Sequence, residues 1–323
     1  MTTTEIKTLL REGAELHLAG RMEEAEKKYR EALTIDESNA VAHNNLGFLL
    51  AQLRKFDESE QEYFRAIELS PEYSTAYTNL GQTYLMMQRW DDAEQYLMKA
   101  ISLDENDFHA NESLAKLFMM KGVASNSEFF WKRCYTLQPQ SGQLIDLAHV
   151  LITQKKLDEA LDVLKNVLPE EEENPRLYLM FGIIYFAKYD FGSAITCFKH
   201  TLGLEPENTE ARHNLAMALL KTGQSDDAVK EFRRILLLSP DHTEARNNLA
   251  VIELAAGETD SALIHFNITL DQEPDNAKAL YYKSIILFNQ GKTNEAKMTL
   301  AATIATNNQD YKPKAEEILA SMN

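Results

Sequence analysis

The sequence predicts an all-α fold built from one two-helix unit that is repeated nine times, and three observations support this prediction. Small residues recur with a period of 34 residues, apart from one step of 33 residues. Apolar residues around them follow the spacing of one face of an α-helix. Proline stands near the end of five units. A period of this length is typical of proteins in which similar units stack side by side.

Each unit begins with a first helix that carries a small residue in its middle. These residues are Gly13, Gly47, Gly81, Ala115, Ala148, Gly182, Ala216, Ala250 and Ser284. In the third unit, residues 75–88 show helical spacing of apolar side chains, and a turn follows at 89–91. Gly223, Gly257 and Gly291 occupy the same turn in later units, where the end of a helix favours a left-handed residue.

The second helix of each unit carries another small residue, followed four positions later by a large apolar one. The small residues are Ala25, Ser59, Ala93, Ser127, Ala160, Ala194, Ala228, Ala262 and Ala296, and the large ones are Tyr29, Tyr63, Leu97, Trp131, Leu164, Phe198, Phe232, Phe266 and Leu300. We expect the two helices to cross closely at the small residues, with the large side chain filling the adjacent gap. Proline then ends the second helix at Pro71, Pro139, Pro206, Pro240 and Pro274.

This pattern resembles the tetratricopeptide repeat family. The family's positions are met in the second unit by Leu46, Gly47, Leu50, Ser59, Tyr63, Ala66 and Pro71, and in the sixth by Phe181, Gly182, Tyr185, Ala194, Phe198, Thr201 and Pro206. The resemblance covers 6–310 as nine repeats, 6–39, 40–73, 74–107, 108–140, 141–174, 175–208, 209–242, 243–276 and 277–310. It implies a right-handed α-solenoid superhelix whose first helices line a concave wall. Residues 311–323, with Pro313 near their start, are expected to form a C-terminal capping helix.

The fifth repeat departs from the pattern. It is one residue out of step with the others, and it closes with the acidic loop 169–175 between two prolines. Two interpretations stay open. Ordinary drift in a loop is the one that we favour. A softer junction between repeats 1–4 and 6–9 is the other, and it predicts faster amide exchange over 141–175 than in the repeats on either side.

Composition argues against several kinds of partner and compartment. A net charge of −17 disfavours nucleic acid and anionic membrane surfaces, because both attract Lys and Arg. The longest apolar run, 179–187, is far shorter than the roughly 18–20 residues of a membrane span, so no membrane insertion is expected. The first residues lack the apolar segment of a secretory signal. We therefore expect a cytoplasmic protein, unless a signal peptide was removed, with Cys134 and Cys197 as buried free thiols.

The sequence contains no motif for catalysis. The phosphate-binding GxxxxGK[ST] pattern, the GxSxG nucleophile pattern and the HExxH zinc pattern are all missing. The eight histidines are scattered, and none has an acidic residue or a cysteine at a diagnostic spacing. We therefore predict a protein that is not an enzyme and that needs no cofactor and no metal.

Asparagine recurs just ahead of the Leu-small pair, although it is a poor helix former. The resemblance implies that positions 2, 5, 6, 9, 12 and 13 of each first helix face inward, and the asparagines occupy positions 5 and 6. Family members that bind extended peptides hold the peptide backbone with such asparagines, because an amide side chain both donates and accepts. An alternative stays open, in which these asparagines only cap or solvate the helices.

Apolar residues at other inward positions suggest an apolar groove, since methionine adapts to irregular partners. Arg212 and Arg246, one repeat apart, could meet an acidic segment of a partner or pair with a nearby carboxylate. The predicted peptide-binding residues are Asn44, Asn45, Phe48, Asn79, Gln82, Met86, Met180, Arg212, Asn214, Met217, Arg246, Asn247, Asn248 and Tyr281.

Two functions follow from this interpretation. The first is a non-catalytic scaffold or adaptor that holds a partner's peptide or protein segment in its concave groove through the asparagines and the apolar wall. The second is a self-assembling structural protein, a homo-oligomer whose repeats pack on copies of itself. Light scattering over a concentration series separates the two, because only the second predicts a mass that grows with concentration.

Overall fold

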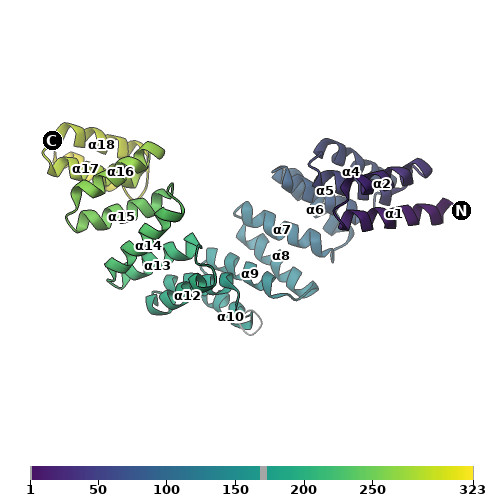
Figure 1. Ribbon diagram of the computed structural model, residues 1–323, viewed down its shortest axis with the longest axis horizontal. Helices are drawn as coiled ribbons and strands as arrows, with labels where there is room; N and C mark the ends of the chain where they lie inside the picture. Colours follow the sequence, from purple (N-terminus) through teal and green to yellow (C-terminus); the bar gives the residue numbers. More distant parts are fainter. Residues whose placement is uncertain (1, 168–172, 323) are drawn as a thin grey trace. The chain divides into compact units, whose positions relative to one another are not determined.

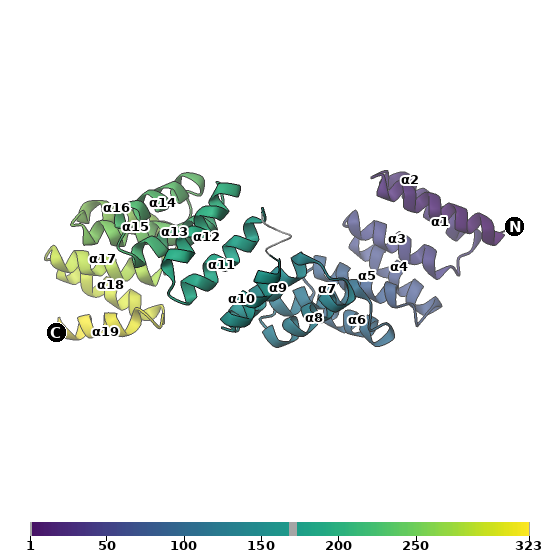
Figure 2. The same ribbon diagram turned by 90° about the horizontal axis from the view of Figure 1, so that it is seen from below.

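The structure is a computed structural model that describes residues 2–167 and 173–322. Within these residues the chain forms nineteen α-helices, which contain more than three-quarters of its residues, and no strand (Figures 1 and 2). The predicted all-α fold is confirmed. Most of the acidic loop 169–175 lies outside the described residues, so the two interpretations of the fifth repeat both stay predictions.

The helices form nine pairs and one final helix. The first helices are α1 (Thr2–Leu18), α3 (Ala40–Gln52), α5 (Ser74–Met86), α7 (Phe108–Met120), α9 (Ser141–Thr153), α11 (Pro175–Ala187), α13 (Thr209–Lys221), α15 (Thr243–Ala255) and α17 (Ala277–Asn289). The second helices are α2 (Met22–Ile35), α4 (Phe56–Leu69), α6 (Trp90–Leu103), α8 (Ala124–Leu137), α10 (Leu157–Val167), α12 (Phe191–Leu204), α14 (Ser225–Leu238), α16 (Thr259–Gln272) and α18 (Thr293–Ala305), and α19 (Lys312–Ser321) follows them. This order is consistent with nine repeats and a capping helix. The bounds that we assign to each repeat stay a prediction.

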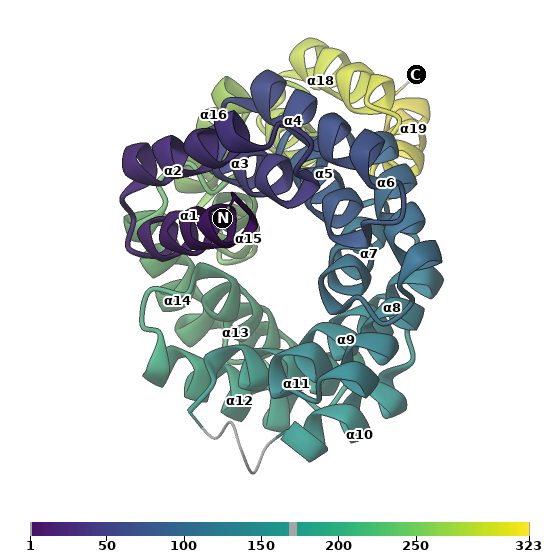
Figure 3. The same ribbon diagram turned by 90° about the vertical axis from the view of Figure 1, so that its right-hand side faces the viewer.

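The chain divides into two compact units, residues 1–167 with α1–α10 and residues 168–323 with α11–α19. In both units the second helix of one pair packs against the first helix of the next, and some first helices also touch each other, such as α3 with α5 and α15 with α17. Figure 3 shows α5, α7 and α9 on the inner side of the first unit, with α6, α8 and α10 outside them. We call the side of each unit that its first helices form the inner face.

The predicted contact between small and large residues forms the core of the pairs. At Gly81 an added Cβ would lie 2.6 Å from Leu97, closer than two carbon atoms can pack, and at Gly47 it would lie 3.0 Å from Tyr63, which is tighter than nearly all such contacts. Tyr63 and Leu97 are fully buried, so they have little room to move. The steric role that we predicted for the small residues is therefore confirmed at these glycines.

The turn inside each pair contains one residue with left-handed backbone. Gly223, Gly257 and Gly291 have φ angles of 77°, 86° and 76°, as predicted from their position in the repeat. Four turns carry another residue type instead, at Arg54, Gln88, Lys155 and Tyr189. These four residues are strained, because a left-handed backbone brings Cβ close to the carbonyl oxygen.

Both cysteines are free thiols. Cys134 is fully buried as predicted, whereas Cys197 is only half-buried. Burial raises the pKa of the Cys134 thiol to about 12 and that of the Cys197 thiol to about 11, so neither is a reactive thiolate at neutral pH. Among the described helices, none has the length and the apolar character that crossing a membrane requires.

Candidate functional site

The predicted amide side chains of the first unit form a hydrogen-bonded row on the inner face. Asn79 on α5 donates through Nδ2 to Oδ1 of Asn44 on α3, at 2.9 Å. Asn44 in turn donates to Oδ1 of Asn45, at 3.3 Å. One turn further along α5, Gln82 donates to Oγ of Ser113 on α7, at 3.1 Å. The row therefore links three neighbouring first helices.

The amides of this row differ in how much of them a partner could reach. Asn44 is only 3% exposed, and its carbonyl and amino groups both bond within the chain, so it supports the packing of repeats. Asn45, Asn79 and Gln82 are half-buried. These three amides are therefore the ones in this row that can contact a partner.

A pocket of about 530 Å³ opens on the inner face between α1 and α3. It is lined by Ala14, His17, Leu18, Tyr29, Asn45, Phe48 and Gln52. Nε2 of His17 lies 2.9 Å from Oε1 of Gln52, and the His17 ring lies 5.5 Å from the Phe48 ring. Two predicted binding residues, Asn45 and Phe48, thus share a pocket with both polar and apolar walls. Binding pockets commonly combine apolar walls with a few polar groups.

Large apolar side chains on this face extend beyond the pocket. Phe48 is 39% exposed, Met86 is 52% exposed and Met120 is 55% exposed. The sequence interpretation missed Leu18, which is 90% exposed beside the pocket. Leu18 is at inward position 13 of the first repeat, but that repeat carries no asparagine ahead of its small residue. The expectation that position 13 of each first helix faces inward, applied to the first repeat, would have identified Leu18.

In the second unit, most of the predicted asparagines are bonded within the chain. Asn248 on α15 accepts a hydrogen bond from Nζ of Lys278 on α17, and its Nδ2 lies 3.6 Å from Sδ of Met217 on α13. Asn247 donates to Oδ1 of Asn276, at 3.0 Å. Asn214 is half-buried and has no side-chain hydrogen bond among the described residues. Among the three predicted asparagines of this unit, it is therefore the one best placed to contact a partner.

Ionisable side chains lie close to this second row of amides. Nε2 of His213 lies 3.5 Å from Oε1 of Glu244, and the ring of His213 stacks on that of His242 with centroids 5.8 Å apart. Burial lowers the pKa of His213 and that of Lys278, and the Glu244 carboxylate opposes both shifts. Both groups therefore lose their proton, and with it their positive charge, at a lower pH than they would on an open surface.

Arg212 and Arg246 are engaged inside their own unit. Arg212 forms an ion pair with Glu231 on α14, at 2.5 Å, and donates to the carbonyl oxygen of Pro206. Arg246 is 8% exposed and donates to the carbonyl oxygen of Pro240. Pairing with a nearby carboxylate, one of the two interpretations from the sequence, agrees with the geometry of Arg212, whereas Arg246 bonds to a backbone carbonyl instead. The argument for an acidic segment in the partner is therefore weaker, and that segment stays a prediction.

The remaining predicted residues differ in how far they are exposed. Met180 on α11 is 8% exposed, so it belongs mainly to the core. Met217 and Tyr281 are half-buried. The Tyr281 ring lies 5.4 Å from the ring of Tyr311, just before α19, so Tyr311 covers part of this tyrosine. The set as a whole stays a prediction.

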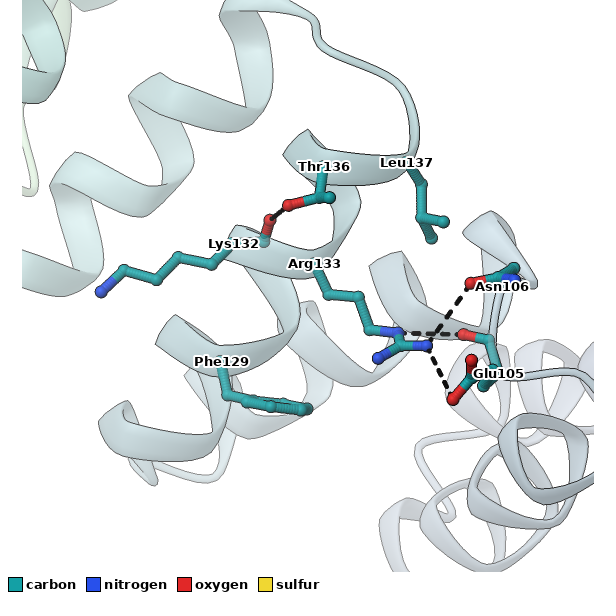
Figure 4. A pocket seen from close by; sticks show the side chains of 7 residues that line it. All are labelled: Glu105, Asn106, Phe129, Lys132, Arg133, Thr136 and Leu137. Atoms are coloured by element: carbon teal, nitrogen blue, oxygen red, sulfur yellow. Dashed lines mark hydrogen bonds and ion pairs between the residues drawn. The ribbon is translucent and has the colours of Figure 1, made fainter.

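A further pocket of about 450 Å³ lies between the α6–α7 loop and α8, away from the inner face (Figure 4). Nε of Arg133 donates to the carbonyl oxygen of Glu105, at 3.0 Å, and its guanidinium group lies 3.3 Å from the Glu105 carboxylate. Phe129, 58% exposed, forms an apolar edge. Because the charge of Arg133 is already matched by Glu105, we assign no ligand to this pocket.

Three family models match the sequence. Two are described as tetratricopeptide repeat and match 38–106 and 185–250, and the third is described as TPR repeat and matches 13–54. The matches fall in both units. A comparison with curated proteins found no match.

Solved structures of low sequence identity share the fold. A chain of the crystal structure of the APC/C hetero-tetramer Cut9-Hcn1 is 19% identical with a TM-score of 0.60, and the match covers 86% of this chain and 55% of that chain. Pseudomonas aeruginosa pilF is 19% identical with a TM-score of 0.58, and the match covers 65% of this chain and 96% of that chain. This chain thus spans about half the length of the Cut9-Hcn1 chain. With its paired helices and the matching family models, the chain belongs to the tetratricopeptide repeat family.

Proposed function

We propose that this protein is a non-catalytic scaffold or adaptor that holds a segment of a partner protein on its inner face. Tetratricopeptide repeat proteins typically mediate protein–protein interactions, and their fold is generally non-catalytic. The observation that carries the proposal is the pocket between α1 and α3, where Asn45 and Phe48 line one wall.

The chemistry of this pocket suits a peptide. Asn45 uses only its Oδ1 in the described hydrogen bonds, so its Nδ2 can donate to a carbonyl oxygen of a partner's backbone. Phe48 and Leu18 expose apolar surface that an apolar side chain of the partner would cover. The half-buried amides of Asn79 and Gln82 continue the row along α5, so an extended segment could follow it.

The test begins with affinity capture and mass spectrometry, followed by a peptide array that maps the bound segment of the partner. Titration of that segment with Phe48→Ala should show binding weakened by roughly tenfold, because one large apolar contact contributes about 1.5 kcal/mol or more. Phe64→Ala is the matched control, since Phe64 on α4 of the same repeat is 41% exposed away from the inner face. An equal loss in both variants would contradict the proposal.

Self-assembly is tested with the same two variants. Light scattering of the wild-type chain should give one mass over a concentration series. A mass that grows with concentration, and that Phe48→Ala returns to a single copy, would replace the adaptor by a homo-oligomer.

A further inference from the structure

The inner face of the second unit differs from that of the first. The ninth residue of each first helix there is apolar, namely Ile183, Met217, Val251 and Ile285. The twelfth residue is apolar as well, namely Phe186, Leu220, Leu254 and Phe288. None of these side chains is fully buried, and Phe288 is 46% exposed. We call these two rows the apolar stripe.

The first unit differs at the ninth position only, because the twelfth residues of α5, α7 and α9 are also apolar and not fully buried, namely Leu85, Met119 and Ile152. The ninth residues of α5, α7 and α9 are Gln82, Lys116 and His149, so polar side chains interrupt the row that begins with Phe48. The ninth position therefore carries a mixed surface in one unit and only apolar side chains in the other, although Val251 and Leu254 are partly covered because they also pack against the core. Contiguous exposed apolar surface on a protein typically marks an interaction site.

The stripe has the length of a short helix. Residues nine and twelve of one helix are neighbours on its surface, so each first helix contributes one apolar pair. The bonds of Asn248 to Met217 and to Lys278 show that α13, α15 and α17 follow one another across this face. Packed helices lie about 8–10 Å apart, so four of them extend the stripe over roughly 24–30 Å. An α-helix of about 16–20 residues has that length.

One edge of the stripe is acidic. Its exposed carboxylates are Glu207, Glu210, Asp241, Glu244 and Asp275, in the first turns of the first helices and in the loops before them. The second residue of a helix lies about 10 Å along the axis from the ninth, which is about the width of one helix with its side chains. Arg176 and Lys278 stand at the two ends of this edge, and Lys278 is bonded to Asn248. The middle of the edge is therefore negative.

The amides beside the stripe favour a helix over an extended peptide. An extended segment needs hydrogen-bond partners for its backbone, whereas a helix satisfies its own backbone and presents only side chains. Asn247 and Asn248 are already bonded within the chain, which leaves Asn214 as the one asparagine of this row without a described partner. This part of the inner face thus offers apolar contact and negative charge, and little capacity to bond a backbone.

We propose that the second unit binds a basic amphipathic α-helix of a partner protein, about 16–20 residues long. The helix crosses α11, α13, α15 and α17 with its apolar residues on the stripe and with Lys or Arg toward the acidic edge. This inference rests on the proposed function, because it specifies the partner of the inner face.

The test uses the full chain and three fluorescent peptides of 18 residues. The first is built from Leu, Lys and Ala, with Leu along one face and Lys along its flanks. The second replaces every Lys by Glu, and the third keeps the composition of the first but has two central prolines, which break the helix. Fluorescence anisotropy should show that the first peptide binds at least tenfold more tightly than the other two. Its affinity should fall as salt rises, because the paired charges are exposed.

Two variants locate the binding. Phe288→Gln removes an exposed apolar side chain from the stripe without opening the core, and it should weaken the first peptide by roughly tenfold. Ile264→Gln is its matched control, because Ile264 is 59% exposed on α16, a second helix of the same unit. Glu210→Gln with Glu244→Gln should flatten the salt dependence, whereas the same neutralisation of Asp226 and Asp227 on α14 should not.

The outcomes separate this inference from the proposed function. Equal binding of the basic and the acidic peptide, or equal effects of Phe288→Gln and Ile264→Gln, overturns the inference. If the proline peptide binds most tightly and Phe48→Ala weakens its binding, the proposed scaffold function is supported and the binding of a basic helix is overturned. If neither Phe48→Ala nor Phe288→Gln weakens binding of the captured partner, both are overturned. A homo-oligomer that Phe288→Gln dissociates would assign the stripe to a second copy instead.

Discussion

Gly182→Ala tests the packing rule on which every helix pair depends. A Cβ added at Gly182 on α11 would lie within 2.9 Å of three ring atoms of Phe198 on α12. Phe198 is fully buried, so its ring cannot turn aside without displacing other core side chains. The substitution therefore has to push the two helices of the pair apart or strain the ring.

Two opposing effects decide the size of the change. Alanine is the better helix former by about 1 kcal/mol, which alone would stabilise the protein. Overpacking of a filled core typically costs about 1–3 kcal/mol. Gly203 on α12 of the same pair separates them, because a Cβ there would have no neighbouring atom within 4 Å. We expect Gly203→Ala to raise the free energy of unfolding by up to about 1 kcal/mol and Gly182→Ala to fall about 1–3 kcal/mol below it.

Urea unfolding followed by circular dichroism measures both variants against the wild-type chain. A third comparison adds Phe198→Ala, which should cost less in the Gly182→Ala background than in the wild type, since the clash is then gone. Equal stabilisation by Gly182→Ala and Gly203→Ala would refute the reasoning, because it would mean that the pair has room for a methyl group.

Four further predictions concern the turns, the charges, the asparagines and the helix content. Tyr189→Gly should raise the melting temperature, because it relieves a left-handed residue and gains about 0.5–1 kcal/mol, and a lower temperature would contradict this. Burial alone would raise the pKa of Glu128, but hydrogen bonds from two lysines and a glutamine hold it at about 2, so its stabilisation is present above pH 4.5 and lost as pH falls toward 2. Glu128→Gln should remove that part of the acid dependence in unfolding titrations. Asn248→Ala should cost about 1 kcal/mol because an ammonium group loses its acceptor, whereas Asn214→Ala should leave unfolding unchanged or raise stability slightly. Circular dichroism should show at least three-quarters helix, far above the roughly one-third of average globular proteins.

The fold was predictable because the same pattern of small and large residues occurs in all nine repeats. Any one pair, such as Gly47 with Tyr63, would be weak support by itself, since small and large residues often stand sixteen positions apart by chance. Repetition in phase removes that ambiguity. The left-handed turns show the limit of this redundancy. Where the turn residue is glycine, as at Gly223, its left-handed backbone could be inferred from the sequence. The side chains of Lys155 and Tyr189 give no indication of a positive φ angle.

The candidate site was predictable only in part, because its side chains bond across repeats. Position in the helix correctly suggested an amide row, yet it could not tell the buried Asn44 from the half-buried Asn45 next to it. The role of Asn248 depends on Lys278, thirty residues later, whose ammonium group reaches back to it. For Arg212 the sequence left two interpretations open, because it does not show that the long side chain turns toward α14, where Glu231 pairs with it. Such contacts depend on side-chain length and direction, which a repeat alignment does not contain.

The two inner faces together suggest how a uniform scaffold acquires specificity. In both units the residues that hold the pairs together are small or large apolar groups at fixed positions, so these positions cannot vary without loss of the fold. The ninth residue of a first helix is less constrained, because it is only partly buried even where it packs against the core, as Val251 does. There the units diverge, with Gln82 in one and Val251 in the other. Differences confined to such positions change what a face can bind while leaving its helices unchanged. Binding variants should therefore act unit by unit, with Phe48→Ala affecting only ligands of the first unit and Phe288→Gln only those of the second.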